Sequence, residues 1–82
     1  MSTFPVLLFS VLKQKVGEAR LTIHLQGPVT GAALLDHLEA RYPSIAEYRG
    51  VVRLAVNCEY VPESVVLVEG DEVALITPVS GG

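Results

Sequence analysis

The sequence predicts an α+β fold in which one main helix packs on one face of a sheet of about five strands. Residues 20–26 alternate between apolar and polar side chains, which is typical of a half-exposed strand. Residues 30–42 place leucines along one helical stripe, and residues 51–77 return to short strand patterns separated by turn residues. The expected order is β-β-α-β-β-β, with residues 1–77 as one domain and residues 78–82 as a flexible C-terminal tail.

The first two strands are expected to pair as a hairpin. Residues 6–12 form a run that is apolar on both faces, as in a central strand. Gly17 and Glu18 mark a turn, and residues 20–26 then form the second strand. Gly27-Pro28 ends this hairpin.

The helix is expected to begin at an N-cap, Thr30, and to run to about Tyr42, where Pro43 closes it. Residues 44–48 are expected to add a short turn that carries Ile45 inward. The apolar stripe of the helix consists of Leu34, Leu35, Leu38 and Tyr42.

Three strands are expected after the helix, over residues 51–56, 60–61 and 72–77, with a short apolar piece at residues 65–68. Pro62 breaks the second of these strands or places it at a sheet edge. The turns are expected near Asn57-Cys58-Glu59 and at Glu69-Gly70-Asp71.

One helix can cover one face of a sheet, yet the first and last strands are apolar on both faces. Phe9 and Ile76, together with Tyr60, therefore either complete the core or lie on an uncovered face. A contiguous apolar group on a surface usually marks a contact site. These three residues are candidates for a partner interface.

The charges divide the chain into two parts. All six Lys and Arg residues lie before residue 54, whereas residues 54–82 contain five acids and no base, within a formal net charge of −3. A phosphate-binding surface needs clustered bases, so the sequence argues against a nucleic-acid partner. The acidic part either suits a basic protein partner or serves solvation alone.

Cys58 is the one cysteine, which excludes an internal disulfide framework and fits a reducing compartment. The first residues lack the basic start of a signal peptide, and no apolar run approaches the ~18 residues that span a bilayer. We therefore expect a cytoplasmic protein without a membrane partner.

Catalytic constellations are scarce. His24, His37 and Cys58 fall on separate expected elements without the spacing of metal ligands, and no glycine-rich phosphate fingerprint is present. We expect no metal and no stably bound cofactor. A nucleophilic pair of Cys58 with a histidine is formally possible, although nothing in the sequence brings such residues together.

The last five residues, Pro78, Val79, Ser80, Gly81 and Gly82, are the remaining feature with chemical potential. A tail that ends in two glycines can carry its carboxylate into a cleft that any Cβ would obstruct. Adenylation by ATP would give this carboxylate a leaving group. Pro78 to Gly81 are therefore the candidate insertion segment, and Gly82 is the candidate reactive residue.

These features together resemble the ubiquitin-like β-grasp sulfur carriers, and among these most closely the small subunits of molybdopterin synthase. The resemblance covers nearly the whole chain and closes on Pro-Val-Ser-Gly-Gly. It departs at Thr77-Pro78, where the family commonly has Pro-Pro after an aromatic residue that here is Ile76. The matching pieces are Val6 to Ser10, Lys13 to Gly17, Leu34, Leu38, Arg41-Tyr42-Pro43, Ala55-Val56-Asn57, Glu59, Gly70 to Val73 and Pro78 to Gly82.

The resemblance implies a mixed β-grasp sheet and a carrier that is not catalytic alone. An adenylating enzyme would use ATP to activate the Gly82 carboxylate, and a sulfur donor would convert it into a thiocarboxylate. The tail would then deliver sulfur to cyclic pyranopterin monophosphate in the large synthase subunit, within a complex of two large and two small subunits. The family's docking patch maps onto Phe9, Tyr60 and Ile76.

Other functions remain open at this point. A carrier for thiamine thiazole or for tRNA thiolation would share the fold, and its tail would carry out the same chemistry. A ubiquitin-like binding module would not need Gly82, whereas a small enzyme would need Cys58.

Overall fold

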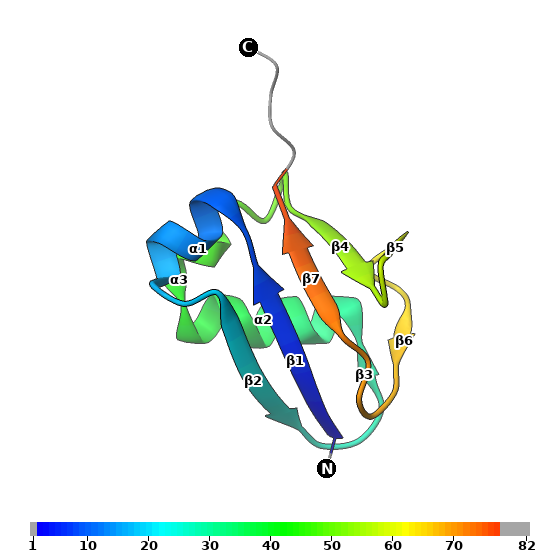
Figure 1. The fold of residues 1–82 in the computed structure, drawn as a ribbon. Helices are drawn as coiled ribbons and strands as arrows, with labels where there is room; N and C mark the ends of the chain where they lie inside the picture. Colours follow the sequence, from blue (N-terminus) through cyan, green and yellow to red (C-terminus); the bar gives the residue numbers. More distant parts are fainter. Residues whose placement is uncertain (1, 78–82) are drawn as a thin grey trace.

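The computed structural model describes residues 2–77. Within this range Figure 1 shows one layer of strands with helices packed behind it. The elements in chain order are β1 (Ser2–Leu8), α1 (Ser10–Val16), β2 (Arg20–Leu25), β3 (Val29–Thr30), α2 (Gly31–Arg41), α3 (Pro43–Ala46), β4 (Arg53–Val56), β5 (Glu59–Val61), β6 (Val66–Leu67) and β7 (Val73–Ile76).

Across residues 2–77 the strands form a five-stranded sheet in the order β2-β1-β7-β4-β5 and a two-stranded sheet of β3 and β6. β1 and β7 pair in parallel, whereas the other neighbours in the larger sheet are antiparallel. The sheet is therefore mixed, and α2 crosses one of its faces (Figure 1). This arrangement confirms the predicted fold class.

The core lies between α2 and the covered face of the sheet. β1 and β7 alternate, so that Val6 and Leu75 point into the core and are fully buried. Thr30 caps α2 as expected, because its Oγ1 accepts a hydrogen bond from the Ala33 N–H at 3.1 Å. Ile45 on α3 is also fully buried, which confirms the predicted inward turn after the main helix.

The predicted first strand is wrong at its C-terminal end. β1 stops at Leu8, and residues 10–16 form α1, so β1 and β2 pair antiparallel but are joined by a helix rather than by a tight hairpin turn. Leu12 belongs to the apolar run of the sequence, yet it enters the core from this helix. Gly17 ends α1 in the left-handed conformation, with φ 88° and its N–H donating to the Lys13 carbonyl.

Two smaller differences concern short strands. Val29–Thr30 forms β3, which pairs with β6 and was not predicted, because two residues carry no periodic pattern. β4 and β7 are each shorter than the predicted residues 51–56 and 72–77.

No helix in the described part of the chain is long and apolar enough to cross a membrane.

Candidate functional site

One row of paired residues crosses the face of the sheet opposite α2. Arg20 of β2 pairs with Leu7 of β1, and Leu7 pairs with Ala74 of β7. Ala74 pairs in turn with Ala55 of β4, and Ala55 pairs with Tyr60 of β5. Because side chains alternate along each strand, the row places two small residues between larger neighbours on this open face.

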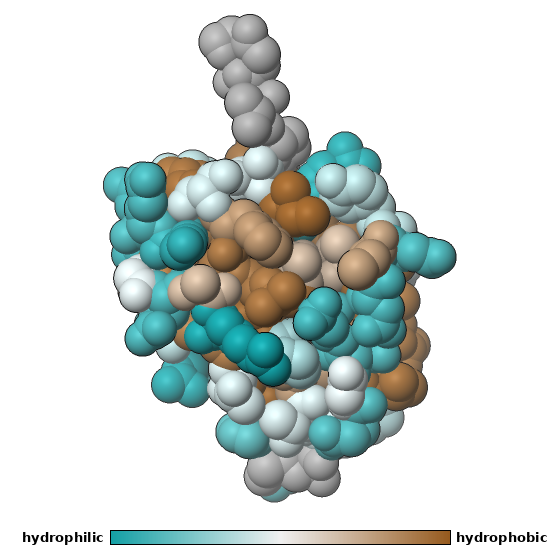
Figure 2. Space-filling model, in the orientation of Figure 1, coloured by the Kyte–Doolittle hydropathy of each residue, from teal (hydrophilic) through white to brown (hydrophobic). Residues whose placement is uncertain are grey.

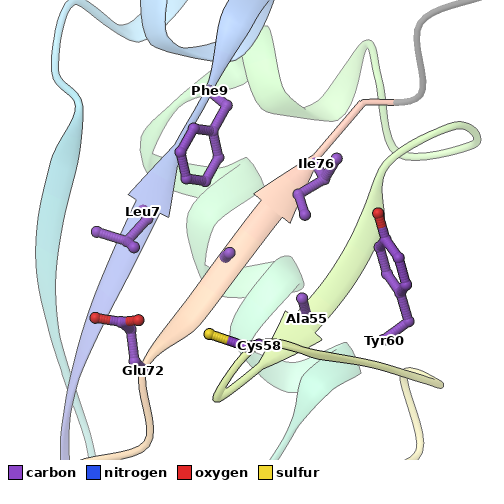
Figure 3. Close-up of a pocket in the computed structure, with 8 residues that line it drawn as sticks. Leu7, Phe9, Ala55, Cys58, Tyr60, Glu72 and Ile76 are labelled. Carbon is purple, nitrogen blue, oxygen red and sulfur yellow. The ribbon is translucent and has the colours of Figure 1, made fainter.

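The two alanines lie in a surface hollow of about 250 Å³. Ala55 is only 5% exposed although it faces away from α2, whereas Phe9 and Tyr60 are 46% and 63% exposed. Figure 3 shows Phe9 and Ile76 near the ends of β1 and β7, with Tyr60 on the other side of the hollow. The residues that line it are Leu7, Phe9, Ala55, Cys58, Tyr60, Glu72, Ala74 and Ile76.

The hollow brings together the three residues that the sequence nominated for a partner interface, Phe9, Tyr60 and Ile76. Apolar side chains gather in the middle of this face and are framed by hydrophilic residues (Figure 2). The structure thus resolves the alternative left by the sequence, since the three residues lie on the uncovered face and are not part of the buried core. The nominated tail residues, 78–82, lie outside the described residues.

Sequence reasoning missed the floor and the acidic border of the hollow. Ala74 lies two residues before Ile76 and Leu7 lies two residues before Phe9, so each pair points to the same face of the sheet. The alternation along the strands could therefore have placed Ala74 and Leu7 in the site. Ala55 and Cys58 join the site through the β4–β5 hairpin, whose register the sequence does not reveal.

A strained turn connects β4 to β5 and places Cys58 beside the hollow. Asn57 and Cys58 both have positive φ, at 51° and 73°. Asn57 holds this turn because its Nδ2 donates to Asp71 Oδ1 at 3.0 Å and its Oδ1 accepts from the Glu72 N–H at 3.1 Å. Cys58 is a free, exposed thiol.

The two ends of β7 differ in charge. Glu69, Asp71 and Glu72 precede the strand, and the Glu72 side chain borders the hollow. Arg53 lies at the other end of the strand, since its Cα partner is Ile76. Its guanidinium carbon lies 5.1 Å from the centroid of the Tyr60 ring.

A second charged cluster lies away from the hollow, where α2 meets the segment after β5. Arg49 donates to Glu63 at 2.9 Å and to Asp36 at 3.0 Å, and it also bonds Glu39. Hydrogen bonding to Glu63, then to Glu39 and Asp36, raises the pKa of Arg49, and the same bond from Arg49 lowers the pKa of Glu63. This cluster ties α2 to the β5–β6 connection.

No group of His, Cys, Asp and Glu side chains between residues 2 and 77 is arranged to hold a metal ion. His24 instead lies close to Thr3, with its Nδ1 2.9 Å from Thr3 Oγ1. Cys58 and His24 lie on different elements, the β4–β5 turn and β2.

Comparisons with known proteins agree with this geometry. The molybdopterin synthase sulfur carrier subunit of Arabidopsis thaliana is 39% identical over 77 residues, which cover 94% of this chain and 80% of the relative. The crystal structure of SAMP1 from Haloferax volcanii superposes with a TM-score of 0.88 at 25% identity, covering 99% of this chain and 100% of that one.

A third neighbour is a chain in the complex of subunits 1 and 2 of the molybdopterin-converting factor from Helicobacter pylori. It superposes with a TM-score of 0.71 at 23% identity and shares the fold, covering 98% of this chain and 99% of that one. The family model described as the ThiS family matches residues 6–82. From this match, the curated relative and the ubiquitin-like β-grasp architecture, it follows that the chain belongs to the ThiS family of sulfur carriers.

Proposed function

We propose that this chain is the sulfur carrier subunit of a molybdopterin synthase. The observation that carries the proposal is the apolar hollow on the open sheet face, next to the end of the strand that leads to Gly81-Gly82. A contiguous apolar surface beside a glycine-ended segment suits a body that docks while its terminus enters a partner. The names of the curated relatives support the same function.

The reactive group is the carboxylate of Gly82. On an activating enzyme, this carboxylate attacks the α-phosphorus of ATP. Pyrophosphate leaves, and a C-terminal acyl adenylate forms. A donor of sulfur at the sulfide oxidation level then displaces AMP and leaves a thiocarboxylate. The activating enzyme provides the ATP site, and this chain provides the acyl group.

Delivery depends on docking to the large synthase subunit. Phe9, Tyr60 and Ile76 provide apolar contact area around the hollow, and Pro78 to Gly81 enter the large subunit. Sulfur then passes to cyclic pyranopterin monophosphate. The transfer is accelerated because docking holds the nucleophilic thiocarboxylate sulfur close to its target. The complex contains two large and two small subunits, and the related Helicobacter pylori complex of subunits 1 and 2 supports such a partnership.

Intact-mass measurement tests the proposal. Incubation with ATP, the activating enzyme and a sulfur donor should add about 16 Da, because sulfur replaces one carboxylate oxygen. A variant without Gly82 should keep its thermal unfolding temperature but gain no mass. A loaded wild type should then convert cyclic pyranopterin monophosphate only with the large synthase subunit. If the loaded carrier instead supports thiazole formation by a thiazole synthase, the carrier belongs to thiamine formation. An unchanged mass would overturn the proposal.

A further inference from the structure

Arg53 lies next to two residues that line the hollow, Tyr60 and Ile76, beside the strand that leads to the C-terminal residues. It is the first residue of β4, and its Cα partner in β7 is Ile76. The 5.1 Å between its guanidinium carbon and the centroid of the Tyr60 ring is within cation–π range. A positive charge therefore lies next to residues that line the apolar hollow at the end of β7.

The Arg53 guanidinium has no carboxylate partner within residues 2–77, where the ion pairs all belong to Arg49. Its contact with Tyr60 restricts the side chain, which reduces the entropy lost when the guanidinium binds another group. A planar guanidinium matches a carboxylate through two parallel N–H···O bonds. Arg53 is thus prepared to bind a carboxylate that lies outside residues 2–77.

The surrounding charge makes this position unusual. Residues 54–82 carry five acids and no base, and three of these acids precede β7 at the end remote from Arg53. A partner that covers this face therefore meets negative charge at the start of β7 and positive charge at its end. The complementary partner surface is basic at the first end and acidic at the second.

We propose that Arg53 is a specificity-determining residue that pairs with a carboxylate of the large synthase subunit. This carboxylate lies beside the group of the large subunit that fills the hollow. The inference rests on the proposed function and adds to it a charged contact at the end of β7. Because this contact is opposite in sign to the acids at the start of β7, it fixes the orientation in which the partner docks. Arg53 positions the carrier and takes no part in the sulfur chemistry.

The effect of removing Arg53 distinguishes a specific pair from general attraction. Arg53→Met changes the formal charge from −3 to −4, since one base is removed. If only net charge matters, a more acidic carrier binds a basic partner more tightly. If Arg53 pairs with a carboxylate, the variant binds more weakly, by about tenfold, because a hydrogen-bonded charge is lost. The two explanations thus predict changes of opposite sign.

Arg41→Met is the matched control. Arg41 is exposed at the end of α2, and its guanidinium carbon lies 5.8 Å from the centroid of the Tyr42 ring. The control removes the same charge and the same kind of aromatic contact at a site away from the hollow. We expect its affinity for the large subunit to equal or exceed that of the wild type.

The experiment measures the dissociation constant between the full-length carrier and the large synthase subunit of the same organism, at low and high salt. Arg53→Lys should recover part of the affinity, because lysine keeps the charge but not the bidentate geometry. A carboxylate-to-arginine variant of the large subunit should restore binding to Arg53→Glu. Equal or tighter binding by Arg53→Met overturns the inference.

Loading at Gly82 keeps this outcome separate from failure of the proposed function. Arg53→Met should gain the same mass as the wild type on incubation with the activating enzyme, ATP and sulfur donor. Impaired loading with unchanged affinity for the large subunit would overturn the assignment of Arg53. A wild type that loads but does not bind the large subunit would overturn the proposed function itself.

Discussion

Asn57 and Asp71 are joined by a hydrogen bond of 3.0 Å that links the β4–β5 turn to the turn before β7. The same Asn57 side chain accepts from the Glu72 N–H, and Asp71 Oδ2 accepts from the Val68 N–H at 2.9 Å. One amide and one carboxylate therefore hold together the two turns whose neighbouring residues, Cys58 and Glu72, line the hollow. The position of Glu72 at the border of the hollow depends on this link.

Asn57→Ala should destabilise the protein by about 1–2 kcal/mol, because it removes two hydrogen bonds and places alanine at positive φ. Urea denaturation measures the loss. Asn57→Gly separates the two causes, since glycine accepts the backbone conformation and loses only the hydrogen bonds. It should be less destabilising than Asn57→Ala, and equal losses would show that the backbone conformation contributes nothing.

Cys58→Gly should stabilise the protein by about 0.5–1 kcal/mol, because glycine relieves a side chain held at φ 73°. Thermal or urea unfolding measures the gain. Cys58→Ala keeps the strain and removes the thiol, so it should leave sulfur transfer unchanged. Loss of transfer in Cys58→Ala would instead assign the thiol a direct chemical role.

Gly31→Ala should destabilise the protein by about 1–3 kcal/mol through overpacking. A Cβ at Gly31 would overlap Leu54 Cδ2 and would lie 3.1 Å from the backbone oxygen of Glu63. The Gly31 N–H also donates to the Val65 carbonyl at 2.9 Å, so the backbone cannot move away without losing this bond. Gly50→Ala is the control, because its Cβ would meet open space, and it should unfold at nearly the wild-type urea concentration.

Ala74→Leu should fill the hollow and weaken association with the large subunit by at least tenfold. The leucine side chain would occupy the space that the partner's side chain needs. Surface plasmon resonance measures the affinity, and circular dichroism verifies the fold. Ala40→Leu makes the same change on the exposed surface of α2 and should bind normally. Unchanged binding by Ala74→Leu would place the docking surface elsewhere.

Arg49→Met should reduce stability at pH 7 by about 1 kcal/mol, as expected for an exposed ion-pair network. Arg49 lowers the folded-state pKa of Glu63, so this contribution is present above the ordinary pKa of 4.5 and is lost as the pH falls through the lowered value. The difference between the wild type and the variant should therefore shrink below pH 4.5. Urea midpoints at neutral and acidic pH measure it, and a constant difference would contradict the linkage.

Periodic patterns predicted the parts of the fold that have regular spacing. Thr30, the leucine stripe and Ile45 were found where local rules place them, because caps and amphipathic helices depend on near neighbours in the sequence. The helix at residues 10–16 was missed because Val11 and Leu12 continue an apolar run, although Gly17 after Lys13 and Lys15 is a helix-stop signal.

The candidate site was predicted only where an excess of apolar residues revealed it. One helix covers only one face of the sheet, which left Phe9, Tyr60 and Ile76 as apolar residues for the other face. The three residues do lie together on the open face. The floor of the hollow and the contact between Arg53 and Tyr60 depend on pairing between strands distant in sequence. Such registers follow from tertiary packing, so single-sequence patterns do not reveal them.

The central position of β7 has a mechanical consequence. This strand is hydrogen-bonded to β1 on one side and to β4 on the other, and the chain continues from its end toward the terminus. A pull on that terminus acts along the strand, so both ladders resist it in shear and the bonds do not open one at a time. The folded body should therefore keep its shape when, as proposed above, a partner draws the end of the chain into a narrow channel.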